Sequence, residues 1–239
     1  MTASAAKLGD VPVLLRGEAR SIRGWMEQWS ATRFALCIAI VVIGTAAFGA
    51  ALGSWRAPQQ ALYTAIKLPL ILLLSALGNG LLNGMVAPLL GINLSLRQSL
   101  LAVLLSFTIA AAILGAFSPL LWFLLWNVPP LGADTASTQS VTTHSLILVT
   151  ETVMIAFAGI AANLRLVRVL QELSGSRGIA RKVLFAWLAG NLLLGSQLAW
   201  ILRPFVGSPS LAVQFLRPDA LRGSFFESLW NAIHHLFFP

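Results

Sequence analysis

Five long apolar segments, separated by short polar connections, make up most of this 239-residue chain. They are Phe34–Gly53, Leu68–Leu90, Leu100 to about Phe117, Leu146–Leu164 and Val183–Leu202. Each is about long enough to cross a bilayer core of roughly 30 Å as an α-helix. The sequence therefore predicts an all-α, polytopic membrane helix bundle of about five transmembrane helices.

The composition agrees with this fold class. Hydrophobic residues make up 57% of the chain and charged residues only 10%, whereas soluble domains carry about 25% charge. We divide the chain into a cytoplasmic N-terminal segment, residues 1–33, a five-span transmembrane bundle, residues 34–202, and an extracytoplasmic tail, residues 203–239. The length leaves no room for a separate soluble domain.

The basic residues predict the orientation, because the richer side of a membrane protein lies in the cytoplasm. With the N-terminus inside, the inner segments hold eleven basic residues and the outer segments five. The inner residues are Lys7, Arg16, Arg20, Arg23, Arg33, Arg97, Arg165, Arg168, Arg177, Arg181 and Lys182. We expect the N-terminus to be cytoplasmic and anionic lipid headgroups, not nucleic acid, to be the partner of this charge.

Both flanks are predicted to form amphipathic helices that lie along the membrane. Near the N-terminus, apolar residues recur at helical spacing from Ile22 to Trp29. At the C-terminus, apolar residues recur every four positions from Leu221 to Phe237, and Ser224-Phe-Phe-Glu227 reads as a capping box that starts a helix near Phe225. Anchoring or docking on the bundle is the simplest role for both, and binding of a partner is the alternative.

Amide side chains inside the spans are informative because lipid offers them no hydrogen bonds. Asn79 and Asn83 are four residues apart in the second span, and Asn191 lies at similar depth in the fifth. We expect a hydrogen bond between these two spans. Gly80 and Gly84 form a small-xxx-small pair that favours close helix packing. A polar pathway is the alternative role for the amides.

Glu151 is the one acidic residue within a predicted span, about five residues from its outer end. Three groups at similar depth are candidates to meet it: Gln197, Arg203 and Lys67. Either the carboxyl has a structural role, as an ion pair with Arg203 as the first candidate or as a hydrogen-bonded carboxyl close to the interface, or it belongs to a proton or cation site. We predict the pair, because a stranded charge in lipid is costly.

No catalytic constellation is visible. The three histidines, His144, His234 and His235, lie near the outer edge of a span and in the tail, and no nucleophile, base and orienting group stand together. Metalloprotease, P-loop and dinucleotide motifs are absent. We expect no enzyme activity, no catalytic, cofactor-binding or metal-binding residues, and no cofactor.

Two segments outside the clear spans are harder to place. Pro119 is expected to break or bend the third helix, which leaves the aromatic-rich stretch Leu120–Trp126 too short to cross again, so re-entry into the membrane stays open. The Ser/Thr-rich run Thr135–Ser145 is predicted to be a solvated loop.

The C-terminal third carries a resemblance. Its pattern GSQ-x-x-W-x-LRPF-x-GSP spans Gly195–Pro209, and FLRP follows at Phe215–Pro218. With Leu77–Gly80 in the second span, this resembles a family of uncharacterised bacterial multi-span membrane proteins. The resemblance implies this architecture and a bacterial inner membrane, in agreement with thirteen arginines against three lysines. It implies no activity.

Two function classes follow. The first is a non-catalytic structural or scaffold component, or a subunit of a membrane complex, with a membrane-protein partner or a second copy of the chain. The alternative is a small channel or transporter that uses Glu151 and the intramembrane Asn and Gln residues. The two differ in whether those polar groups line one water-filled cavity or are consumed in hydrogen bonds between helices.

Overall fold

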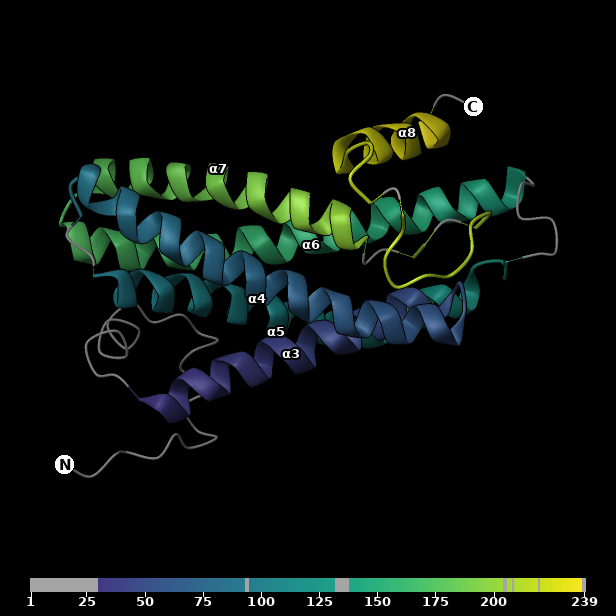
Figure 1. The fold of residues 1–239 in the computed structure, drawn as a ribbon, viewed down its shortest axis with the longest axis horizontal. Coiled ribbons are helices and arrows are strands. Elements are labelled where there is room, and N and C mark those ends of the chain that lie inside the picture. The colour runs from purple at the N-terminus through teal and green to yellow at the C-terminus, as the bar shows by residue number, and fades with distance from the viewer. Residues whose placement is uncertain are drawn as a thin grey trace. The chain divides into compact units, whose positions relative to one another are not determined.

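The described part of the chain is all-helical. A computed structural model describes residues 30–92, 95–131, 138–203, 206–207, 209–218 and 220–237. Its six helices are α3 (Ala31–Ser54), α4 (Pro58–Leu89), α5 (Leu96–Asn127), α6 (Thr138–Ser174), α7 (Arg177–Leu202) and α8 (Phe225–Phe237). These residues contain no strand (Figure 1). The first five helices are long and apolar enough to cross a membrane, which confirms the predicted multi-span fold class.

The third span is longer than expected. α5 continues through Pro119 to Asn127, so the helix break that was one of the two expectations at Pro119 does not occur, and the aromatic stretch Leu120–Trp126 belongs to the same helix. Proline removes one backbone N–H, and membrane helices tolerate this because other groups satisfy the freed backbone. Beside the proline, the Ser118 hydroxyl donates to the Leu114 carbonyl at 3.3 Å. A single 32-residue helix results.

The Ser/Thr-rich run is also helical from Thr138 onward. Ser140, Thr143 and Ser145 are buried, so the prediction of a solvated loop is wrong for these residues. Hydroxyl side chains can face a helix neighbour as readily as water, and composition alone does not separate the two cases.

The connection between the fourth and fifth spans is much shorter than the roughly 20 residues expected from the apolar segments. α6 ends at Ser174 and α7 begins at Arg177. Gly175, with φ of +64°, adopts the left-handed conformation that ends many helices. The five basic residues predicted to lie in this connection therefore belong to helix ends: Arg165 and Arg168 to α6, and Arg177, Arg181 and Lys182 to α7.

Contacts divide the chain into two units, and each long helix contributes a segment to both. Unit 1 comprises residues 1–42, 72–112 and 158–194, and unit 2 comprises residues 43–71, 113–157 and 195–239. Each unit is described separately below.

Unit 1 depends on a close approach of α4 to α5. A Cβ atom built at Gly80 would lie 2.5 Å from Leu100 Cδ2 and 3.0 Å from Leu100 Cα, and one at Gly84 would lie 2.7 Å from Leu96 Cδ1. The Ser99 hydroxyl donates to the Gly80 carbonyl at 2.9 Å. The predicted small-xxx-small contact is therefore confirmed, with α5 as the neighbour.

Unit 2 contains a second close contact of this kind, which the sequence analysis did not single out. Gly49 and Gly53 of α3 face the first turns of α4: a Cβ atom at Gly49 would lie 2.6 Å from the Thr64 carbonyl oxygen, and one at Gly53 2.6 Å from Ala61 Cα. Small residues let helix backbones approach closely where lipid supplies no hydrophobic driving force. The hairpin of α3 and α4 is packed in this way.

α8 begins where the sequence predicts. The Glu227 amide donates to the Ser224 hydroxyl at 3.3 Å, which is one half of the expected capping box. The inward face includes Phe225, Leu229 and the buried Ala232. The predicted N-terminal amphipathic helix, from Ile22 to Trp29, lies outside the described residues.

Gly80→Leu is expected to lower the melting temperature of the purified protein in detergent. The new side chain has no room against Leu100, and overpacking of this kind costs about 1–3 kcal/mol. Gly159→Leu is the matched control, because a Cβ atom there meets nothing within 4 Å. Equal melting temperatures for the two variants would contradict the packing described above.

Candidate functional site

The seven candidate polar residues do not form one cluster. The structure places Asn79, Asn83 and Asn191 in unit 1, and Lys67, Glu151, Gln197 and Arg203 in unit 2. The amides of unit 1 share a cavity, and Lys67 and Arg203 line one pocket in unit 2. Glu151 and Gln197 are not among the residues that line these two spaces.

The expected hydrogen bond between the second and fifth spans is present. The Asn79 Nδ2 donates to Asn191 Oδ1 at 2.9 Å, and also to the Ser75 carbonyl at 2.9 Å. Gly190, beside Asn191, allows this approach: a Cβ atom there would lie 3.4 Å from Asn79 Oδ1. The amides therefore join α4 to α7.

These amides also line a cavity of about 60 Å³ in unit 1. Its polar lining residues are Asn79, Asn83, Ser106, Asn163, Trp187 and Asn191. Two buried atoms of this lining have no hydrogen-bond partner, the acceptor Asn79 Oδ1 and the donor Trp187 Nε1. The space is large enough for a few water molecules, which bind in cavities that offer such groups.

The predicted pairing of Glu151 with Arg203 does not form. Glu151 is fully buried, and neither carboxyl oxygen has a hydrogen-bond partner. Arg203 instead stacks on Trp200, with its guanidinium carbon 4.5 Å from the ring centroid, and donates from Nη2 to the Arg222 carbonyl at 3.2 Å. Similar depth along two helices does not fix which way each side chain points, and this is why the prediction failed.

The other two candidate partners also turn elsewhere. Gln197 is exposed. Lys67 is buried, with 2% of its surface exposed, and it belongs to a pocket whose lining does not include Glu151.

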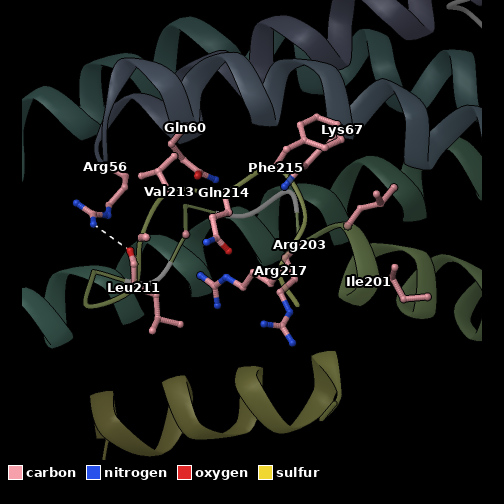
Figure 2. A pocket seen from close by; sticks show the side chains of 13 residues that line it. Arg56, Gln60, Lys67, Ile201, Arg203, Leu211, Val213, Gln214, Phe215 and Arg217 are labelled. Carbon is pink, nitrogen blue, oxygen red and sulfur yellow. Dashed lines mark hydrogen bonds between the residues drawn. The ribbon is translucent and has the colours of Figure 1, made fainter. Parts of the chain in front are cut away.

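That pocket gathers four cations. Arg56 and Lys67 come from the α3–α4 hairpin, and Arg203 and Arg217 come from the segment that follows α7. Figure 2 shows them around one space, with Gln60 and Gln214 between them. None of the described residues that line it is acidic. The described lining residues therefore carry four formal positive charges and no negative one.

The tail folds back over α4 to make this pocket. Phe215 packs edge-on against Tyr63, with ring centroids 5.4 Å apart, and its ring centroid lies 4.9 Å from Lys67 Nζ. A cation over an aromatic face is attracted to it, and more so where water is excluded. On the other side, Arg56 Nη2 donates to the Leu211 carbonyl at 3.2 Å. These contacts place the lysine beneath the tail.

The last turn of α7 fixes Arg203 at the pocket. Its amide closes the helix by donating to the Ala199 carbonyl at 2.8 Å, and its φ of +40° turns the chain away from the helix axis. The Arg222 carbonyl accepts both from Arg203 and from Trp200 Nε1, the latter at 2.8 Å. The guanidinium is thus oriented by a ring on one face and a carbonyl at its edge.

The charges in this pocket repel one another. Arg217 acts electrostatically on Lys67, which is 2% exposed and lies in cation–π contact with Phe215. A buried charge without a counter-charge is strongly unfavourable. Convergent guanidinium and ammonium groups of this kind can bind an anion, which would accept hydrogen bonds from them.

Sequence reasoning named Lys67 and Arg203 but missed Arg56, Arg217 and Gln60 as site residues. Arg217 belongs to the FLRP motif, Phe215–Pro218, which contributes to the family resemblance. This motif was the one feature of the sequence that could have pointed to Arg217 as a site residue. Arg56 was counted only for orientation.

Other chemistry is not evident in the described residues. They contain no group of three or more His, Cys, Asp or Glu side chains able to hold a metal ion. Searches against protein-family models, curated proteins and solved structures found no match to this chain.

Glu151→Met is expected to leave the melting temperature in detergent unchanged or to raise it, because the carboxyl makes no hydrogen bond that methionine would remove. An unsatisfied buried polar group costs about 1–3 kcal/mol, which sets the upper limit of the gain. Asn79→Leu serves as the contrast and is expected to destabilise the protein, since it breaks the bond to Asn191. A marked loss of stability in Glu151→Met would show that the carboxyl has a partner.

Proposed function

We propose that this chain is a non-catalytic multi-span membrane protein that binds a phosphate-type oxyanion through Arg56, Lys67, Arg203 and Arg217. In this proposal it acts as a component or subunit of a membrane assembly, by binding and not by reaction. The resemblance of its C-terminal third to bacterial multi-span proteins supports a bacterial plasma membrane as its location. Eleven basic residues lie in the segments expected on the same side of the membrane as the N-terminus, against five on the other side. This excess supports a cytoplasmic N-terminus.

The burial of Lys67 carries the proposal. Lysine is almost never fully buried unless it is paired, yet Lys67 is 2% exposed and its described surroundings supply three further cations and no carboxylate. Cation–π contact with Phe215 offsets part of the cost, but it supplies no counter-charge. Binding of an anion would offset the repulsion and part of the cost of burying the lysine charge.

The chemistry of the donors favours an oxyanion with several oxygens. Guanidinium groups present forked N–H donors that match phosphate and carboxylate, and lysine adds a compact charge. The space among the four side chains is only about 10 Å³, enough for one water-sized group. A terminal phosphate that inserts one oxygen fits this description better than a whole soluble metabolite.

A channel or transporter is the second candidate, and the amide-lined cavity favours it. One cavity in unit 1 is bordered by Asn79, Asn83, Asn163 and Asn191. Two buried polar atoms in its lining have no hydrogen-bond partner. Neither Glu151 nor Gln197 borders that space. A channel through this cavity would therefore not use two of the polar residues that the sequence suggested for it. The amide hydrogen bond between α4 and α7 also has a purely structural use.

Inorganic phosphate is expected to bind the purified protein in a neutral maltoside detergent at low salt, as measured by isothermal titration calorimetry. Lys67→Gln should weaken binding at least tenfold, because it removes the buried charge. Lys182→Gln is the control: it deletes the same charge from an exposed position in α7 and should bind as the wild type does.

Arg217→Gln is the second test of the same pocket and should also weaken binding. Equal phosphate affinity in wild type and both pocket variants would overturn the proposal.

The orientation is tested with single cysteines in a Cys37→Ala background. Gln139→Cys, in the first turn of α6, is expected to react with a membrane-impermeant maleimide added outside intact cells. Glu172→Cys, near the other end of α6, should react only after the cells are opened. Both positions are exposed. The reverse pattern would place the N-terminus outside.

A further inference from the structure

A second cavity adjoins the cationic pocket. It measures about 250 Å³ and shares Arg203, Gly207 and Arg217 with the pocket of Lys67. Its other walls come from α6, α7 and α8: His144, Leu148, Trp200, Phe225, Ser228 and Leu229. In Figure 2, Arg203 and Arg217 lie between Lys67 and the yellow helix at the foot of the view, which is α8.

The two spaces differ in chemistry. The Lys67 pocket is lined by cations and amides, whereas leucine, phenylalanine and tryptophan side chains make up much of the wall of the larger cavity. Protein interiors are close-packed and hold few voids larger than a water molecule. An apolar cavity of about 150 Å³ is known to take up a molecule the size of benzene, so 250 Å³ has room for part of a hydrocarbon chain.

α8 forms one wall of this cavity and exposes aromatic residues on its other face. Its inward face closes the cavity with Phe225 and Leu229, and its other face exposes Phe226, Trp230 and Phe237, each more than half accessible. A short helix with exposed tryptophan and phenylalanine is typical of the interfacial region of a bilayer, where headgroups and the upper parts of acyl chains meet.

Resting on the proposed oxyanion function, we infer that the ligand is a membrane amphiphile with a phosphate headgroup. Its phosphate binds Lys67, Arg203 and Arg217, and the start of its hydrocarbon chain occupies the cavity beneath α8. The shared arginines stand at the junction of the two spaces, where the headgroup of such a molecule meets its chain. A soluble phosphate compound would leave the apolar cavity unused.

The test compares two probes on the full-length protein in neutral maltoside: inorganic phosphate and 1-oleoyl-lysophosphatidate, which adds a single chain to a phosphomonoester. Native mass spectrometry and calorimetry measure the complexes. Wild type is expected to bind the lipid at least tenfold more tightly than phosphate. A monoacylglycerol with the same chain should bind at least tenfold more weakly than the lysophosphatidate.

Two variants separate this inference from the oxyanion function. Leu229→Trp fills the cavity and should remove the advantage of the lipid while phosphate affinity is retained. Leu221→Trp is the matched control, since Leu221 is exposed and does not line the cavity; it should behave as wild type. Lys67→Gln should weaken both probes.

The outcomes are distinct. If phosphate binds through Lys67 but the lipid binds no more tightly, or if Leu229→Trp leaves lipid binding unchanged, the amphiphile inference is overturned and the oxyanion function stands. If phosphate does not bind, and lipid binding is indifferent to Lys67→Gln, both are overturned.

Discussion

The lack of hydrogen-bond partners in lipid is the constraint on which this structure depends. It confines the described spans to helices and turns many hydroxyl side chains back onto their own backbone: Thr64, Thr108 and Thr152 each donate to the carbonyl four residues earlier. Against this background the exceptions are informative. Lys67 is buried in cation–π contact with Phe215, and Glu151 is buried with neither carboxyl oxygen hydrogen-bonded. Lys67 lies in a pocket with three arginines, whereas Glu151 lines neither that pocket nor the amide-lined cavity.

Hydropathy was sufficient to predict the five spans, because about 20 consecutive apolar residues are the length of a helix that crosses a bilayer. The bond between Asn79 and Asn191 was also predictable, since two amides at equal depth have little else to bind. The direction in which each side chain points could not be predicted from the sequence. Glu151 and Arg203 share a depth but face different neighbours. The sequence left open whether Pro119 breaks or bends the third helix, and the helix continues because one missing N–H is readily tolerated within a long membrane helix.

The cationic pocket lay beyond sequence reasoning for a different reason. Arg56, Lys67, Arg203 and Arg217 are separated by up to about 160 positions and meet only because the segment after α7 folds back on α4. An irregular segment has no periodicity to predict its path. In the sequence, Arg56 and Arg217 counted only as orienting charges, and Lys67 and Arg203 were candidate partners of Glu151. Their convergence depends on contacts such as Phe215 on Tyr63, which no local pattern encodes.

Phe215 gives this pocket a property that its charges alone would not. The ring covers the lysine ammonium and anchors the tail to Tyr63 at the same time. A ligand bound between Lys67 and the tail would stabilise the tail's contact with α4, and this contact would strengthen ligand binding by the same free energy, as linkage requires. α8 follows this segment in the chain, so the contact of Phe215 with Tyr63 also restrains the segment that leads into the C-terminal helix.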